Sequence, residues 1–231
     1  MFGSVKDFPY LGDIKSKFGN VMERVNLFSP FYYKANIAET ELLQQIHLEA
    51  MLINYKAFPH HSHDWNVHTS YWLDNNEQLP YKINWEHFFS IYQHYIDQFC
   101  LEFFGAGRSW EIIDNIWYNV YGKGQDGMQH NHIGEDFSAI HYFKFNPEAH
   151  IGTTFINPRI NEVKYYESLR KECVSKLDLA NPDHSLYHRV FTPQVNEGDF
   201  IIFPSHLDHT IYRNDSDELR VTIAMNFRIN S

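Results

Sequence analysis

The second half of the chain is a series of short segments rich in β-branched and aromatic residues, and this pattern limits the possible folds more than any other feature. Seven such segments cover residues 110–122, 137–146, 150–157, 189–195, 199–205, 208–213 and 219–229. Turn-forming residues separate them, as at Asn146-Pro147 and Asn157-Pro158. Many short strands at this spacing are typical of a β-sandwich or a closed barrel. We therefore expect a mainly β core, interrupted by one helix near 161–178.

Two amphipathic helices are expected before this core. Residues 38–56 and 84–105 carry apolar side chains at helical spacing. Asn84 is suited to cap the start of the second helix, and Gly105 is suited to end it. Residues 1–37 are expected to form an irregular or extended lead-in. The helices should pack on one sheet of the core as a buttress.

Nothing in the sequence divides the chain into separate domains. The 231 residues contain no internal repeat, low-complexity segment or flexible linker, and the hydrophobic content of 43% is enough for a sizeable core. We expect a single domain over 1–231, with a helical lead-in and buttress in 1–109 and the β core in 110–231.

The charge balance argues against some classes of partner. The formal net charge of −10 reflects 29 acidic against 19 basic residues, and the basic residues are scattered. Such a surface repels phosphate backbones and anionic membranes, so neither is an expected partner. The sequence shows no apolar stretch of membrane-spanning length and no secretory signal pattern. With only Cys100 and Cys173, no disulfide framework is implied, and the expected location is the cytoplasm.

A small group of the 15 histidines lies at positions suited to a metal site. His130 and His132 stand at i and i+2, so on a strand end both would point to the same face. His209 follows the apolar segment 199–205 at the start of the next expected strand. Such ligands can hold one face of a divalent metal, with Fe(II) favoured, and leave the other face open for a co-substrate and O₂.

A basic residue completes this arrangement one strand further on. Arg220 stands eleven residues after His209, in a segment that otherwise alternates as a core strand. A guanidinium group is a planar, two-pronged donor for a carboxylate. The pattern therefore matches the needs of an Fe(II) oxygenase that uses a 2-oxo acid.

These motifs resemble the 2-oxoglutarate/Fe(II)-dependent oxygenases of bacteria and phages, which are distantly similar to prolyl hydroxylases. The resemblance covers most of the chain. The matching segments are 67–73 (VHTSYWL), 117–124 (WYNVYGKG), the HNH at 130–132, 138–143 (SAIHYF), and 198–209 (GDFIIFPSHLDH) with the strand that contains Arg220. The first of these is the least specific.

The resemblance implies a fold and a set of site residues. The fold would be a double-stranded β-helix, a cupin-like jelly roll. His130 and His209 would be iron ligands. Arg220 would bind the 5-carboxylate of 2-oxoglutarate together with Thr222, which lies on the same strand face. Tyr121 and Tyr142 would line that pocket.

The third metal ligand departs from the usual pattern. The superfamily usually has aspartate or glutamate two residues after the first histidine, where this chain has His132. Either His132 replaces the carboxylate, or the acid comes from Glu135 or Asp136 in the following loop; we favour His132. Three neutral ligands would leave the Fe(II) site with a charge of +2 instead of +1, which alters O₂ activation.

The remaining histidines near these motifs receive other interpretations. The group at 60, 61, 63 and 68 has no regular metal-binding spacing and is expected in a solvated loop or a substrate-entrance wall. His141 is expected to face the opposite side of its strand from Ile140 and Tyr142. His206 is expected to lie in a loop close to the metal site without binding the metal.

The sequence therefore predicts an Fe(II)- and 2-oxoglutarate-dependent dioxygenase that uses O₂ to hydroxylate an unidentified small-molecule or peptidyl substrate. Two alternatives stay open at this point. One is a three-histidine cupin-type metalloenzyme that does not use 2-oxoglutarate, and the other is a non-enzymatic jelly-roll binding module. A homodimer formed through the N-terminal helices is compatible with the sequence.

Overall fold

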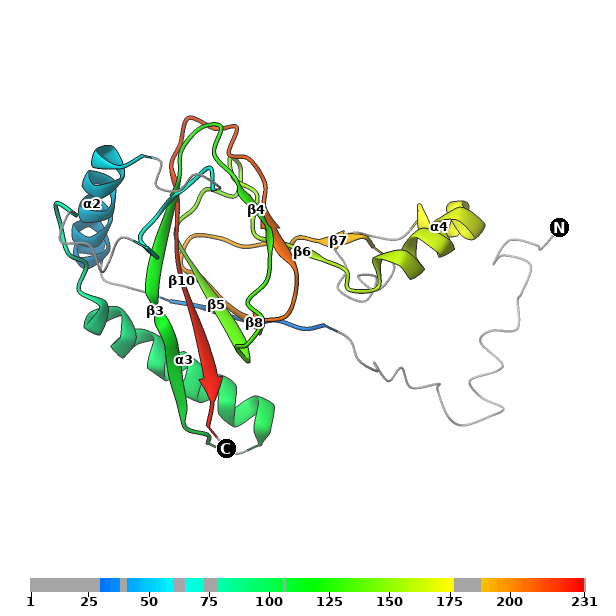
Figure 1. Ribbon diagram of the computed structural model, residues 1–231, viewed down its shortest axis with the longest axis horizontal. Helices are drawn as coiled ribbons and strands as arrows, with labels where there is room; N and C mark the ends of the chain where they lie inside the picture. Colours follow the sequence, from blue (N-terminus) through cyan, green and yellow to red (C-terminus); the bar gives the residue numbers. More distant parts are fainter. Residues whose placement is uncertain are drawn as a thin grey trace.

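A computed structural model describes residues 30–37, 41–59, 65–72, 79–105, 107–176 and 188–230. In this part of the chain, strands form two antiparallel sheets, with helices outside them (Figure 1). The six-stranded sheet has the order β1-β8-β5-β10-β3-β2, and the four-stranded sheet has the order β4-β9-β6-β7. The strands of the first are Tyr33–Asn36 (β1), Asp199–Pro204 (β8), Phe137–Lys144 (β5), Arg220–Ile229 (β10), Trp110–Tyr121 (β3) and His68–Thr69 (β2). Those of the second are Gly127–His130 (β4), His209–Ile211 (β9), Thr154–Ile156 (β6) and Val190–Phe191 (β7).

The chain passes repeatedly from one sheet to the other. From β4 to β10, successive strands alternate between the two sheets, except that β6 and β7 are neighbours in the same sheet. Within the described residues, neighbouring strands of both sheets pair antiparallel. This arrangement is that of a double-stranded β-helix, and the prediction of a mainly β fold is confirmed.

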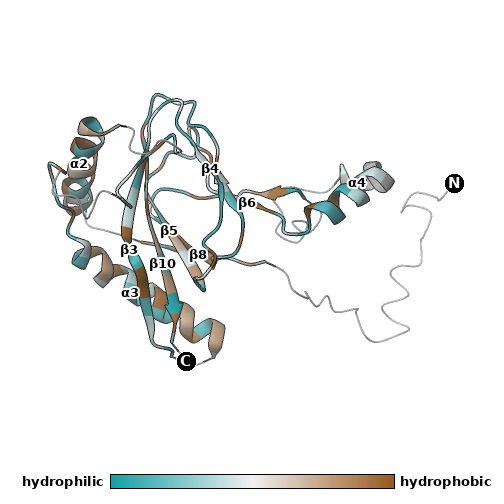
Figure 2. Cartoon of the chain, in the orientation of Figure 1, coloured by the Kyte–Doolittle hydropathy of each residue, from teal (hydrophilic) through white to brown (hydrophobic). Residues whose placement is uncertain are grey.

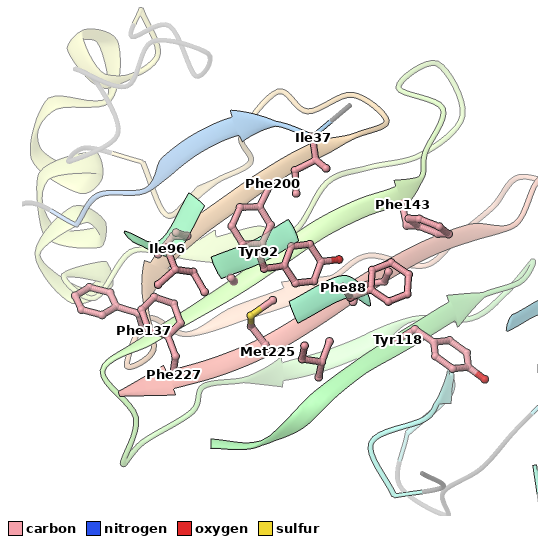
Figure 3. Packing of buried hydrophobic residues seen from close by; sticks show 14 of the residues in the cluster. Ile37, Phe88, Tyr92, Ile96, Tyr118, Phe137, Phe143, Phe200, Met225 and Phe227 are labelled. Atoms are coloured by element: carbon pink, nitrogen blue, oxygen red, sulfur yellow. The ribbon is translucent and has the colours of Figure 1, made fainter. Parts of the chain in front are cut away.

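The large sheet is buried on both faces, and two of its central strands, β5 and β8, carry apolar residues on each face. In β10, Val221, Ile223, Met225 and Phe227 pack toward the helices, and the corresponding residues of β5 and β8 join them in one cluster. Figure 3 shows this cluster, with Phe88 and Tyr92 among the side chains that pack against the sheet. Such two-sided burial is typical of a sheet covered by other layers on both faces.

The expected helical buttress is present. Helix α3 (Trp85–Phe104) buries Phe88, Tyr92, Ile96 and Phe99, whose spacing of three or four residues gives one apolar stripe. Asn84 caps its start by accepting a hydrogen bond from His87 N, and Gly105 ends it with φ of 69°. Both predictions for this helix are confirmed. Figure 2 shows hydrophobic residues on α3 and on the strands beside it.

Two further helices differ in their relation to the sheets. Helix α2 (Glu41–Ala57) buries Met51 in the same cluster as α3. Helix α4 (Ile160–Val174) follows β6 and projects away from the two sheets in Figure 1. No helix in the described ranges is both long and apolar enough to cross a membrane.

The other face of the large sheet turns toward the small sheet and carries polar residues. On β10 these are Arg220, Thr222 and Asn226, which alternate with the apolar residues that face the helices. Arg220 pairs in register with Tyr121 and Thr222 pairs with Asn119 of β3. The sequence thus places a polar stripe between the sheets, where most residues of a sandwich would be apolar.

Strand β3 contains an irregularity beside this stripe. Its pairing with β10 jumps from Met225↔Ile116 to Asn226↔Ile113, so two residues of β3 are left without a partner. One of them, Asp114, has φ of 64°, a conformation that non-glycine residues rarely adopt. Its carboxylate accepts a hydrogen bond from the Tyr71 hydroxyl at 3.0 Å.

Two features of the sheets were not predicted from the sequence. The edge strands β1 and β2 come from the region before residue 110, where a lead-in and a loop were expected. Strand β4 was also not predicted as a separate element, although His130 at its end was considered as a strand residue.

Candidate metal centre

Three histidines meet at one side of the space between the sheets. His130 ends β4 and His209 begins β9, and the two residues are direct cross-strand neighbours with ring centroids 4.3 Å apart. The His132 ring lies 5.1 Å from that of His130 and 5.4 Å from that of His209. One nitrogen from each ring lies within 4.8 Å of the others, so one ion could reach all three.

His132 reaches this cluster by a route that the sequence did not indicate. Strand β4 ends at His130, so the alternation of a strand does not place His132. Its backbone N instead donates to Ser205 O at 2.9 Å, which ties the turn after β4 to the end of β8. The expectation that both histidines share one site agrees with the geometry, but the expected cause was wrong.

Two of the rings are oriented by the backbone carbonyl two residues earlier in the chain. His130 Nδ1 lies 2.8 Å from Met128 O, and His209 Nδ1 lies 2.9 Å from Leu207 O. A carbonyl oxygen can only accept, so Nδ1 carries the hydrogen in both rings. The lone pair of Nε2 is therefore free to bind a metal, an arrangement common in metal-binding histidines.

The environment keeps these imidazoles neutral. Burial lowers the pKa of His209 to about 3 and that of His132 to about 4, and neighbouring histidines add to both effects. Burial also lowers the pKa of His130. A metal ligand must be the neutral imidazole, so the donor set needs no proton release to bind an ion near neutral pH.

The two loop carboxylates considered as alternative ligands have partners elsewhere. Glu135 forms an ion pair with Arg228 at 3.4 Å. Asp136 accepts a hydrogen bond from Ile229 N at 2.8 Å. Among the residues that the structure describes, His130, His132 and His209 form the one group whose ligand atoms could hold a metal ion.

A cavity of about 240 Å³ opens beside the histidines. Its walls come from both sheets and from the segment around β2, and none of the lining residues is charged. The lining includes Trp65, Thr69, Tyr71, Trp72, Trp117, Asn119, Tyr121, His130, Asn131, His132, Ser138, Thr153, Phe203, His209, Thr222 and Asn226. Its lining of aromatic side chains with a few polar groups is typical of a site that binds a small molecule.

Arg220 is fully buried close to this cavity and is under-satisfied. Its Nη1 donates to Ile151 O at 2.7 Å, but Nε and Nη2 have no hydrogen-bond partner within the described residues. The guanidinium lies 5.1 Å from the ring centroid of Tyr121, and burial lowers its pKa. A buried cation with two free donors is costly unless an anion binds there, and a carboxylate fits this geometry.

The other residues predicted for this pocket divide into two groups. Thr222 and Tyr121 line the cavity, and burial raises the pKa of Tyr121 to about 12, so its hydroxyl remains a donor. Tyr142 is buried, and its hydroxyl accepts a hydrogen bond from Thr153 N at 3.1 Å. Tyr142 thus supports the loop before β6 and does not itself line the cavity.

Thr153 is a candidate that sequence reasoning missed. Its side chain lines the cavity, and its Oγ1 is buried without a hydrogen-bond partner among the described residues. It stands two residues after Ile151, whose carbonyl accepts from Arg220. No local pattern singles out this threonine, since only the folded loop brings it beside the polar stripe.

The structure also describes three histidines outside the metal centre for which expectations followed from the sequence. His141 faces the helices and lies 2.9 Å from the Tyr92 hydroxyl, as its strand phase predicted. His206 is exposed. The expectation for His68 was wrong, because it is buried and contacts Phe58 O and the Tyr118 hydroxyl. The histidines at 60, 61 and 63 lie outside the described residues.

The part of the chain that holds these residues is similar to a known protein family. Residues 115–226 match the model of a family described as "Putative 2OG-Fe(II) oxygenase". This segment is similar to the 2OG-Fe(II) oxygenase family. The match contains all three histidines and Arg220. The oxygenase family brings Fe(II) and 2-oxoglutarate as its cofactor and co-substrate, and the neutral nitrogen donors and the under-satisfied Arg220 suit both.

Solved structures agree with this fold. AviO1 from Streptomyces viridochromogenes matches with a TM-score of 0.52 and 10% identity, over 85% of this chain and 89% of that one. A Pseudomonas putida prolyl-4-hydroxylase matches with a TM-score of 0.51 and 10% identity, over 87% and 93%. A Trichoplax adhaerens prolyl hydroxylase matches with 0.51 and 11%, over 85% and 83%. These likenesses confirm the double-stranded β-helix fold, and no curated protein matches the chain.

Proposed function

We propose that the chain is an Fe(II)- and 2-oxoglutarate-dependent oxygenase in which His130, His132 and His209 hold the metal. Arg220 would bind the remote carboxylate of 2-oxoglutarate. The observation that carries the proposal is the pairing of a neutral three-nitrogen cluster with a buried guanidinium that lacks two hydrogen-bond partners. Arg220 lies on the large sheet, and His130 and His209 are paired on the small sheet.

The chemistry of the bound group and the work of the protein can be separated. In this family the metal and 2-oxoglutarate together reduce O₂, form succinate and CO₂, and oxidise a C–H bond of the second substrate. The protein side chains would position the co-substrate and protect the reaction from water. Arg220, with Thr222 and Thr153 as neutral neighbours, would orient the co-substrate. The apolar and aromatic walls of the cavity would exclude water.

The approach to the metal centre is bounded by aromatic rings. Neighbouring ring centroids lie 4.7 to 6.1 Å apart around a closed circuit of His130, Trp65, Trp72, Tyr71, Trp117 and His132. All six line the cavity. We infer that the second substrate presents an uncharged C–H-bearing group, carried by a small molecule or a peptide. One structural neighbour is a prolyl hydroxylase in complex with a peptide fragment.

Succinate formation tests the proposed function. Purified protein with Fe(II), 2-oxoglutarate and O₂ should convert the co-substrate slowly to succinate without a second substrate, and His209→Ala should abolish this turnover. An anaerobic titration with 2-oxoglutarate should show binding only when a metal is present. Absence of both binding and turnover in metal-loaded protein would overturn the proposal.

A three-histidine metalloenzyme that does not use 2-oxoglutarate is the second candidate. The observation that favours it is that the loop acids contact Arg228 and Ile229, which leaves an all-histidine donor set. This candidate predicts that the protein binds a metal and that replacing Arg220 changes the affinity for no small-molecule ligand. The same anaerobic titration separates the two, because only the first candidate binds 2-oxoglutarate through Arg220.

We propose that residues 1–231 act as one domain, with the β core in 110–231, and that the protein works in the cytoplasm. A homodimer through the N-terminal helices is tested by sedimentation of the purified protein. The uncharged lining of the cavity supports a small-molecule or peptidyl substrate and gives no support to a polyanion.

A further inference from the structure

A buried chain of polar side chains leads away from His132. The Asn226 side chain lies between His132 and Ser138, with Asn226 Nδ2 3.2 Å from His132 Nδ1. Its Oδ1 lies 2.8 Å from Ser138 Oγ, which in turn lies 2.8 Å from Ser205 Oγ. Asn226 is only 3% exposed, and it directly faces Ser138 in the pairing of β10 with β5. Buried polar chains of this kind fix the orientation of each member.

The direction of these hydrogen bonds determines where His132 carries its hydrogen. An amide NH₂ group only donates, so His132 Nδ1 must accept from Asn226 and the ring hydrogen must lie on Nε2. In that tautomer neither nitrogen has a lone pair free for a metal. His130 and His209 are in the opposite tautomer, with Nδ1 donating to a carbonyl and Nε2 free.

A half-turn of the Asn226 amide would remove this conflict. Oδ1 would then accept from His132 Nδ1–H, and Nε2 would gain a free lone pair. Nδ2 would donate to Ser138 Oγ, whose hydroxyl could donate to Ser205, because either oxygen of that pair can be the donor. The amide keeps both of its neighbours in the two orientations, and its shape hardly changes.

We propose that Asn226 is a positioning residue that sets the ring tautomer of His132, and thereby whether the site offers two or three nitrogens to a metal. The inference rests on the proposed metal role of the three histidines. Metal binding is then coupled to reversal of the Asn226, Ser138 and Ser205 hydrogen bonds. Asparagine suits this role because it both donates and accepts, whereas aspartate would hold His132 permanently in the metal-binding tautomer.

Long-range ¹H–¹⁵N spectra of the histidine rings test the proposal without any turnover. In metal-free wild type at pH 7.5, His132 should be the Nε2–H tautomer, and His130 and His209 should be Nδ1–H. Addition of Zn(II), a diamagnetic probe, should convert His132 to Nδ1–H with Nε2 bound. The proposal is overturned if His132 shows the same tautomer with and without Zn(II), or if it stays unbound.

Variants test the same point through Zn(II) affinity. Asn226→Leu removes the partner of Nδ1 and should weaken Zn(II) binding about 10- to 100-fold. Asn226→Asp should restore binding to the wild-type level or better, with His132 already Nδ1–H before metal is added. Asn119→Leu is the matched control, because it changes the same residue type in the same cavity, and it should leave the affinity unchanged.

The outcomes separate this inference from the proposed function. Equal Zn(II) affinity in wild type and folded Asn226→Leu would overturn the role of Asn226 even if succinate is formed. A tautomer change without 2-oxoglutarate binding would support the role of Asn226 and contradict the oxygenase assignment. If Asn226→Leu does not fold, the wild-type spectra and Asn226→Asp decide.

Discussion

Replacing Arg220 by methionine should change co-substrate affinity and protein stability in different directions. Truncating one partner of a buried charge pair costs 2 to 5 kcal/mol, so we expect a loss of about 3 kcal/mol, or roughly a hundredfold, in 2-oxoglutarate affinity. Metal affinity should not change, because the described contacts of Arg220 include none of His130, His132 and His209. Isothermal titration of the Ni(II)-loaded protein under anaerobic conditions measures both quantities.

The effect on stability follows from the contacts of Arg220 in the absence of co-substrate. Its one hydrogen bond, to Ile151 O, contributes on the order of 1 to 3 kcal/mol, and its position beside the rings of Tyr121, Tyr142 and Phe145 contributes about 1 to 2 kcal/mol. Burying the cation with two unpartnered nitrogens costs several kcal/mol. The variant without co-substrate should therefore be as stable as wild type or more stable.

The matched control is Arg228→Met on the same strand. Arg228 is half-exposed, and its ion pair with Glu135 should contribute little. This variant should bind 2-oxoglutarate as wild type does. The reasoning is refuted if Arg220→Met keeps full 2-oxoglutarate affinity, or if its melting temperature without co-substrate falls by more than that of the control.

Three other predictions concern the metal, the pH dependence and the packing. His209→Ala should keep its circular dichroism spectrum but lose Ni(II) affinity by roughly a hundredfold, measured by titration. Burial lowers the pKa of His141 to about 3, so between pH 6.5 and about pH 3 only the unfolded chain takes up this proton. The free energy of unfolding present above pH 6.5 is therefore lost as the pH falls through this range. Between pH 7 and pH 5, the free energy of unfolding of His141→Gln, measured with urea, should therefore fall by about 2 kcal/mol less than that of wild type. An equal fall in both proteins would contradict the lowered pKa of His141. Gly122→Ala would place its new methyl group against the Tyr55 hydroxyl and should destabilise the protein by about 1 to 3 kcal/mol, while Gly107→Ala, which meets open space, should have the same melting temperature as wild type.

Some parts of the fold follow directly from local sequence. The strands around Phe143 and Phe203 were predicted because these short segments are rich in β-branched and aromatic residues and are bounded by turn residues. Helix α3 was predicted with its ends because Asn84 and Gly105 carry specific capping signals. The edge strands β1 and β2 were missed, since two to four residues are too few for a recognisable alternation.

The site was predicted less completely, because its parts depend on contacts across the sheets. His130 and His209 could be singled out from their positions relative to apolar strands and turns. The placement of His132 depends on a backbone hydrogen bond to Ser205, which no local pattern reveals. Thr153 and Asn226 gain their importance only from residues far away in the sequence, so neither could be identified without the fold.

The alternation of polar and apolar residues along β10 limits which insertions and deletions this protein can tolerate. Arg220, Thr222 and Asn226 occupy one face of this strand, and Val221, Ile223 and Met225 occupy the other. Inserting or deleting one residue at the start of the strand would exchange these faces, sending the guanidinium into the helix-packed core and valine toward the cavity. Changes of length in this region should therefore be tolerated only in the loop before Arg220, or in steps of two residues.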